Sequence, residues 1–247
     1  MRTGSSIFFN YCVLFFLSLS ATPVFAQTSF IDQLLHSQKS LVSIRALKTQ
    51  IYGQQQTEAA IDKKSGKILV AEKAKASLAE KNGAGVIIDP SGLIVTNLHV
   101  IYGADKIAVI FHNQTQVSAQ VVELNPAADL ALLKVKPPFH LEAVSFADSN
   151  RVRLRDEIIN IGHSELLHKT ISGGKISGIG TRDGRGNIEL IQVNMNLYKG
   201  DSGGPLFDHN GRLIGMITAK NFAKDKTSYA IPSNKIRELY HQHFQTQ

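Results

Sequence analysis

The chain has 247 residues, of which 43% are hydrophobic and 19% charged, and its formal net charge is +7. This composition is close to the globular average, which excludes a disordered, collagen-like or mucin-like chain. The basic residues are scattered, and neither an aromatic-interleaved basic block nor a zinc-type Cys/His spacing occurs, so no nucleic-acid partner and no metal site are expected.

The N-terminus has the pattern of a secretory signal peptide over residues 1–26. Arg2 is the only charged residue before Asp32, an apolar run covers 13–19, and small residues precede the expected cleavage before Gln27. The alternative is an uncleaved membrane anchor, but a spanning helix needs about 20 apolar residues and this run is shorter. We therefore predict an exported protein, periplasmic or secreted, without stable membrane insertion after cleavage.

The only cysteine, Cys12, lies inside that apolar run. Cleavage would remove it, so the mature chain is expected to have no disulfide and no thiol nucleophile. Any covalent chemistry must then use another type of residue.

The first part of the mature chain is expected to be structurally mixed. Residues 27–52 show helical spacing over 28–39 and then an alternating strand from Leu41. Residues 53–82 are rich in Gln, Lys, Glu and Ala and have little strand periodicity. This composition predicts a mobile insertion loop, with some helix around 71–81.

From Gly83 onward the sequence has an all-β texture, in which short Val/Ile/Leu-rich runs alternate with turn signals. The first set, within 83–136, comprises 85–88, 93–96, 107–111, 117–124 and 130–135. A linker is expected over 137–150, and the second set, within 151–232, comprises 158–161, 170–179, 188–194, 205–207, 213–219 and 228–231. The prediction is two six-stranded antiparallel barrels packed together, followed by an amphipathic helix over 233–247.

The segment Gly200–Pro205 carries the strongest chemical signal. Glycines on both sides of Ser202 let the backbone turn sharply and present N–H groups beside its hydroxyl. Acyl transfer requires this arrangement, because the serine oxygen attacks a carbonyl while backbone donors hold the developing oxyanion. By itself the segment is more simply a structural turn, because serine needs a base to act as a nucleophile.

His99 and Asp129 are the candidates for that base and for its orienting acid. His99 follows an apolar strand and Asp129 precedes a buried one. Taken singly, they are more simply a core histidine and a strand-end cap. Taken together, the chain order His99, Asp129, Ser202 draws two residues from the first strand set and one from the second, which predicts a site in the cleft between the barrels.

These motifs form an ordered set along the chain: Gly83–Asp89, Val95–Val100, Asp129–Val135, Gly200–Pro205, Leu213–Gly215 and Tyr229–Ser233. Together they resemble the trypsin-like serine proteases of the bacterial HtrA (Deg) type, over a span from about Leu41 to the C-terminal helix. The resemblance implies a chymotrypsin/trypsin-like double β-barrel, with no metal or organic cofactor, that acts as an exported serine endopeptidase on polypeptides.

Carried over residue by residue, the resemblance makes His99 the general base, Asp129 the acid that orients it and Ser202 the nucleophile. The amides of Gly200 and Ser202 would form the oxyanion hole. The sequence departs from HtrA proteins in ending at Gln247, so no PDZ domain is expected. It also has Asp201 where they usually carry Asn. In secreted trypsin-type enzymes that acid pairs with a freshly cleaved N-terminus, a role not expected here because the mature end lies far upstream.

The first specificity pocket is expected to be walled by residues just before the nucleophile and by the strand after Leu213–Gly215: Asn196, Leu197, Thr218, Ala219 and Lys220. No carboxylate stands where a trypsin-like pocket would hold one, so a buried Arg or Lys would lack a counter-charge. Medium aliphatic side chains are therefore predicted before the scissile bond. An acidic preference guided by Lys220 is the alternative.

Two further alternatives stay open on the sequence alone. The chain could be a protein-binding or chaperone-like module on a protease fold with little turnover, although the complete triad argues against it. The 53–82 insertion, simplest as a loop, could instead be a regulatory arm that reaches a neighbouring subunit, as the family resemblance suggests. A homo-oligomer is compatible with either reading.

Overall fold

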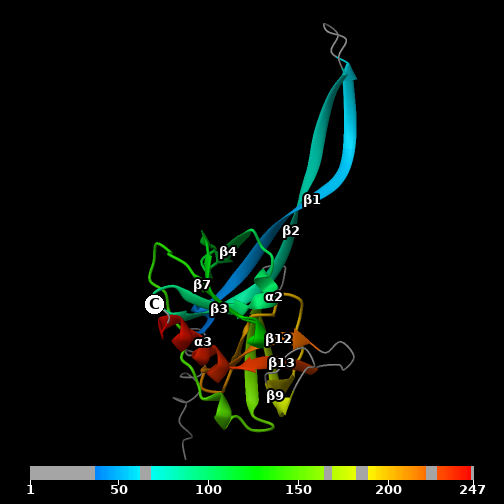
Figure 1. Ribbon diagram of the computed structural model, residues 1–247. Helices are drawn as coiled ribbons and strands as arrows, with labels where there is room; N and C mark the ends of the chain where they lie inside the picture. Colours follow the sequence, from blue (N-terminus) through cyan, green and yellow to red (C-terminus); the bar gives the residue numbers. More distant parts are fainter. Residues whose placement is uncertain (1–36, 62–67, 164–168, 182–188, 221–226, 246–247) are drawn as a thin grey trace, which may run out of the picture.

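The computed structural model describes residues 37–61, 68–163, 169–181, 189–220 and 227–245 (Figure 1). The signal-peptide prediction and most of the expected N-terminal helix fall outside these residues, and only 37–39 of that helix are seen. Within the described part of the chain, none of the helices has the length and apolar character needed to cross a bilayer.

The first half of the protein is a single antiparallel sheet with the strand order β5–β4–β1–β2–β3–β7–β6. Its strands are β1 (Leu41–Ile61), β2 (Ile68–Asp89), β3 (Leu93–Asn97), β4 (Lys106–Ile110), β5 (Gln116–Ser118), β6 (Gln120–Asn125) and β7 (Leu130–Lys134). The run expected over 117–124 is divided at Ala119, whose N–H donates to Ile107 O at 2.9 Å. The two pieces, β5 and β6, lie at opposite edges of the sheet. This half is therefore a half-barrel with open edges, whereas a closed six-stranded barrel was expected.

The long hairpin of β1 and β2 projects away from the rest of the molecule (Figure 1). Its two strands pair antiparallel from Leu41 opposite Val86 out to Ile61 opposite Ile68, with one irregularity between Tyr52 and Gln56. The helix expected around 71–81 was wrong, since this backbone is paired as strand, and the insertion loop expected over 53–82 is strand at 53–61 and 68–82. The Ala, Lys and Glu content favours a helix locally, but cross-strand pairing overrides that preference.

The second half is a closed barrel with the strand order β10–β13–β12–β11–β8–β9. The strands are β8 (Glu157–His163), β9 (Lys169–Thr181), β10 (Leu190–Asn194), β11 (Pro205–Phe207), β12 (Leu213–Lys220) and β13 (Thr227–Pro232). All six runs expected in this half form strands. A closed six-strand barrel beside a half-barrel gives the all-β, trypsin-like double-barrel architecture.

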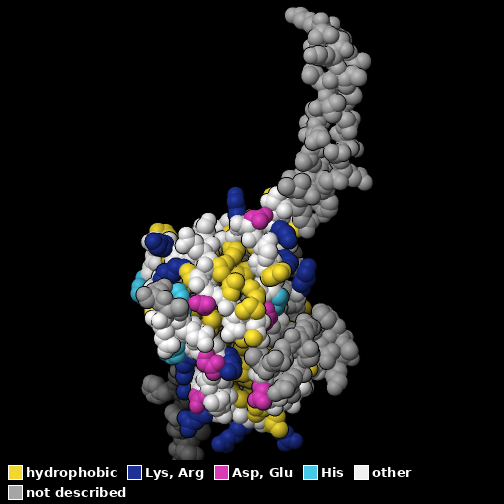
Figure 2. All heavy atoms as spheres, viewed as in Figure 1, with side chains coloured by type: hydrophobic (Ala, Val, Ile, Leu, Met, Phe, Trp, Pro, Cys, Tyr) yellow, Lys and Arg dark blue, Asp and Glu magenta, His cyan; other side chains and the backbone are white. Residues whose placement is uncertain are grey.

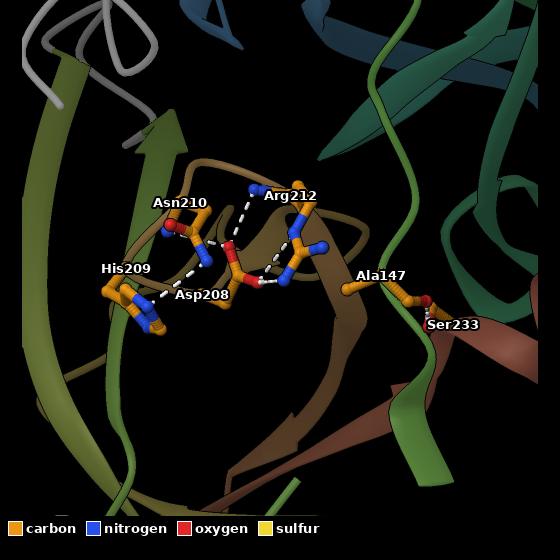
Figure 3. A network of polar contacts seen from close by, with 6 residues as sticks. All are labelled: Ala147, Asp208, His209, Asn210, Arg212 and Ser233. Carbon is orange, nitrogen blue, oxygen red and sulfur yellow. Dashed lines mark hydrogen bonds and ion pairs between the residues drawn. The ribbon is translucent and has the colours of Figure 1, made fainter. Parts of the chain in front are cut away.

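The tight turn between β11 and β12 is organised by one carboxylate (Figure 3). Asp208 accepts hydrogen bonds from the backbone N–H groups of Asn210 and Arg212 and from the Arg212 guanidinium, at 2.8–3.0 Å. Gly211 has a φ of 67°, which most side chains disfavour. The Asp-His-Asn-Gly sequence thus closes the hairpin that carries β12 back toward the site.

The helix α3 (Ser233–Gln245) closes the C-terminal end. Ile236 and Leu239 are buried in a core cluster that also contains side chains of both halves, among them Val86, Leu132 and Met216. This shared core holds the first sheet and the second barrel together, and it sets how the residues contributed by each half approach one another.

The buried face of α3 ends on a histidine. His243 is buried whereas the neighbouring Phe244 side chain is half exposed. The buried positions 236, 239 and 243 follow the helical repeat, so His243 belongs to the face that packs against the core.

Candidate active site

The strand register brings His99 and Asp129 together. β3 pairs with β7 so that Asn97, the last residue of β3, lies opposite Leu130, the first residue of β7. Helix α2 (Leu98–Ile101) follows β3 directly, and the 3-10 turn Pro126–Ala128 comes just before Asp129. His99 and Asp129 are neighbours because antiparallel pairing aligns the end of β3 with the start of β7.

Asp129 accepts five hydrogen bonds, four of them from the segment around His99. Its carbonyl oxygen accepts from the backbone N–H of Leu98 and the Asn97 amide, both at 3.1 Å. Its Oδ1 accepts from the His99 backbone N–H at 2.9 Å, and its Oδ2 contacts His99 Nδ1 at 2.6 Å. When Nδ1 carries the ring proton and donates it in a hydrogen bond to that carboxylate, Nε2 is left as the acceptor, which is the tautomer that a general base needs.

The backbone and charge of Asp129 reflect this role. It has a φ of 54°, in the left-handed region that Asp tolerates better than most residues. Burial acts to raise the pKa of the carboxyl, but the hydrogen bonds from His99 and Thr218 outweigh it, so the pKa lies below the ordinary value. The acid is thus a carboxylate at neutral pH, able to stabilise an imidazolium that forms on His99.

Thr218 supplies the fifth bond and was not anticipated in this role. Its hydroxyl on β12 donates to Asp129 Oδ2 at 2.6 Å, linking the second barrel to the acid of the first half. The sequence placed Thr218 only in the substrate pocket, and no local motif indicates its true partner, which lies 89 residues away.

Replacing Thr218 with Val should lower kcat/KM about tenfold. Valine keeps the shape but removes the hydroxyl, and a hydrogen bond to a charged group contributes about 1.5–3 kcal/mol, part of which the remaining donors recover. Steady-state kinetics on a peptide substrate measures the effect. Thr218→Ser, which keeps the hydroxyl, is the matched control and should stay within about twofold of wild type. Equal losses in both variants would show that the methyl group, not the hydrogen bond, matters.

Ser202 lies in a turn that is tied to both halves. Its carbonyl oxygen accepts from the Ala84 N–H on β2 at 2.8 Å, and the next residue, Gly203, donates to Ile217 O on β12 at 2.8 Å. The side chain itself is only partly buried. Ser202 and His99 both lie in the described part of the chain, and their side chains are not hydrogen-bonded to each other. A hydrogen bond between a nucleophile and its base often tightens only when substrate binds.

Glycines make this close approach possible. A Cβ on Gly203 would lie 2.0 Å from Ala84 O, and Gly203 also has a φ of 85°. A Cβ on Gly83 would lie 2.7 Å from Val100, on the helix of His99, and 3.1 Å from Ser202 O. Strand β2 therefore lies directly between the helix of His99 and the turn of Ser202, so it sets the spacing between base and nucleophile.

The turn before the nucleophile has the geometry of a type II turn. Asp201 N–H donates to Tyr198 O at 3.1 Å, closing a four-residue turn, and Gly200 at its third position has a φ of 101°. A type II turn requires such a value there, and Gly adopts it without strain. The two amides assigned to the oxyanion hole, those of Gly200 and Ser202, lie on either side of Asp201.

The five pocket residues are placed unequally. Asn196 is exposed, whereas Leu197 is 4% exposed and belongs to the core cluster of the second barrel. Thr218 contacts Asp129, as described above. On β12, Ala219 pairs with Tyr229 of β13 and Lys220 pairs with Ser228. The structure describes the backbone of Ala219 and Lys220 but not their side chains.

Comparison with known proteins gives a consistent result. The family model described as "Trypsin-like peptidase domain" matches residues 83–216. The probable periplasmic serine protease do/HhoA-like of Haemophilus influenzae is 37% identical over 167 residues, covering 65% of this chain and 36% of that protein. The magnetosome formation protease MamE of Paramagnetospirillum magneticum is 38% identical over 167 residues, covering 64% and 23%. The chain thus spans about a quarter to a third of the length of these relatives.

Solved structures agree with the sequence comparison. The HtrA-type protease AlgW with decapeptide is 25% identical and superposes with a TM-score of 0.71, covering 87% of this chain and 67% of that one. The likeness therefore extends over both halves of the fold, well beyond the segment that the family model matches.

Proposed function

Because this chain belongs to the trypsin-like peptidase family, with HtrA-type proteases among its relatives, we propose that it is an exported serine endopeptidase that hydrolyses polypeptides through His99, Asp129 and Ser202. The observation that carries the proposal is the 2.6 Å contact between His99 Nδ1 and Asp129 Oδ2, which leaves His99 Nε2 as an acceptor. The helix of His99 packs against β2, and the same strand contacts the turn that contains Ser202.

In the proposed mechanism, His99 Nε2 takes the proton from Ser202 Oγ as that oxygen attacks the scissile carbonyl. The amides of Gly200 and Ser202 hold the oxyanion, and Asp129 stabilises the imidazolium. His99 then gives its proton to the leaving amine. In the second half, His99 activates a water molecule that hydrolyses the acyl-enzyme and regenerates Ser202.

Labelling with a fluorophosphonate tests this proposal directly. The reagent phosphonylates a serine only when a base activates it. We expect stoichiometric labelling of the protein purified without its first 26 residues, with the modification located on Ser202 by peptide mass spectrometry. Heat-denatured protein is the control. Absence of labelling, together with retained binding of unfolded polypeptides, would instead favour a chaperone-like module with little turnover.

The proposed location is the periplasm or the exterior, after removal of residues 1–26. Several relatives, including the periplasmic serine endoprotease DegP of Salmonella typhimurium, carry a periplasmic assignment in their names. Polypeptides are the proposed partners, with a homo-oligomer as a further proposed assembly.

A medium aliphatic residue such as Val, Ala or Leu is expected before the scissile bond. Position 196, six residues before Ser202, carries Asn rather than an acidic residue. A basic substrate side chain in the pocket would therefore be desolvated without a counter-charge from this position, at a cost of several kcal/mol. A peptide library varied only at that position measures the preference. Fastest cleavage after Arg or Lys would contradict it, and fastest cleavage after Asp or Glu would favour guidance by Lys220.

A further inference from the structure

Asp201, the residue before the nucleophile, is a buried acid with an incomplete set of partners. The residue is 1% exposed. Its Oδ2 accepts a hydrogen bond from the backbone N–H of Tyr198 at 2.7 Å, whereas its Oδ1 is buried and has no hydrogen-bond partner. A buried oxygen without a donor is costly for a carboxylate, which needs several donors, but not for a neutral carboxyl, which itself carries a proton.

Among the described residues, no cation compensates for a charge on Asp201. Burial raises the pKa of this carboxyl above its ordinary value, and the Tyr198 N–H only partly offsets that effect. Tyr198 and Lys199, the titratable residues of the same turn, are both exposed. Neither these two side chains nor His99 and Asp129 of the first half act as a counter-charge that shifts the pKa of Asp201.

A second buried acceptor without a partner belongs to Asn160 on β8. Asn160 is fully buried, and its amide donates to Pro205 O at 2.9 Å while its own Oδ1 has no partner. A Cβ on Gly204 would lie 3.2 Å from Asn160 Nδ2 and 2.8 Å from the backbone oxygen of Asp201, so both residues pack against Gly204. The hydrogen bond of the Asn160 amide thus goes to Pro205 O and not to the Asp201 carboxyl.

The side chain of Asp201 also holds the catalytic turn in shape. The turn Tyr198–Asp201 is closed twice, by the Asp201 N–H to Tyr198 O and by the Tyr198 N–H to the Asp201 carboxyl. An ionised carboxyl can escape its desolvation by rotating toward solvent, which breaks the second bond. The amides of Gly200 and Ser202, on either side of Asp201, would then lose their alignment.

We propose that Asp201 is a proton-controlled positioning residue: the neutral acid holds the Tyr198–Ser202 turn in its oxyanion-binding form, and ionisation releases the turn and lowers turnover. The proposal rests on the proposed peptidase function. Ionisation of Asp201 then adds a descending limb to the pH profile, beside the ascending limb that arises because His99 must be unprotonated to act as base.

The test compares pH profiles of kcat/KM for wild type and Asp201→Asn. An asparagine amide is neutral and, like a protonated carboxyl, both donates and accepts. Wild type should pass through a maximum and then fall by up to about tenfold per pH unit, as expected for loss of one proton. The Asn variant should keep the ascending limb and lack the descending one. Glu157→Gln, at a carboxylate whose side chain is 79% exposed, is the control and should follow wild type.

Two outcomes would overturn the proposal. One is an Asn variant whose profile falls in parallel with that of wild type. The other is an Asn variant with little activity at every pH, which would mean that the ionised acid is the working form. Wild type inactive at every pH would instead count against the peptidase function, and the role of Asp201 would then be decided by stability.

Urea unfolding of the Ser202→Ala protein, with and without Asp201→Asn, gives that independent readout. Since folding raises the pKa of Asp201, its stabilising effect is complete below the unfolded-state value of about 3.9 and is lost as pH rises through the folded-state value. The Asn variant should therefore be more stable at neutral pH, by a margin that narrows as the pH is lowered. A margin that does not change with pH would contradict the proposal.

Discussion

Replacing Ser202 with Ala is expected to lower kcat by on the order of 10⁶, by analogy with the removal of other triad nucleophiles. The change deletes the attacking oxygen, and no thiol is available to take its place if Cys12 leaves with the signal peptide. The fold should persist, because the Ser202 group that contacts Ala84 is the backbone carbonyl, which alanine retains. Hydrolysis of a peptide substrate measures the loss, and circular dichroism with urea unfolding checks the fold.

The matched control for that variant is Ser177→Ala. Ser177 is an exposed serine of the same barrel, on β9, where its hydroxyl accepts a hydrogen bond from Gln192. This control should retain wild-type activity. If Ser202→Ala kept most of the activity, the assignment of the nucleophile would be wrong.

Asp129→Asn is expected to lower kcat by about 10⁴. The amide presents an N–H group where Oδ1 or Oδ2 now accepts, so at least one donor among His99 and Thr218 is left facing another donor. If the amide faces Nδ1, the imidazole must take the other tautomer, in which Nε2 carries the proton and cannot accept one from Ser202. The loss should appear in kcat much more than in KM, because substrate contacts are unchanged.

Asp148→Asn is the control for this substitution. Asp148 is also hydrogen-bonded, to Asn234 and to the N–H of Asn150, and these bonds hold its pKa below the ordinary value, but neither partner belongs to the candidate site. Its amide variant should lose stability without a loss of kcat. If the Asp129 variant kept wild-type kcat, Asp129 would not be the orienting acid.

Acidification should reveal the same interaction as a loss of stability. Because the pKa of Asp129 is lower in the folded protein, its stabilising effect is present above the unfolded-state value of about 3.9 and disappears as pH falls through the folded-state value. In Asp129→Asn that part of the acid dependence is absent, so its unfolding free energy should vary less with pH between neutral and acid conditions.

The sequence alone predicted the strands from Gly83 onward, apart from the break at Ala119, and it singled out His99 and Asp129, which the structure places in contact. Alternation of apolar and polar residues reports which backbone can form a half-buried strand, and this information is local. The ordered motifs around His99, Asp129 and Ser202 are local as well, and they were enough to indicate the family. The number of strands expected for the first half was nearly right. The sheet has seven strands instead of six because the run expected over 117–124 is divided at Ala119 into β5 and β6.

The tertiary structure alone decided which groups meet across long distances in the chain. Residues 68–82 have a composition that favours helix, yet they pair with β1 because a partner strand was within reach. The hydroxyl of Thr218 finds Asp129, His243 turns into the core, and Asp201 is left with one donor for two oxygens. Propensity and periodicity describe a residue and its near neighbours, whereas burial and hydrogen-bond satisfaction depend on segments that arrive from elsewhere, so only the folded chain determines them.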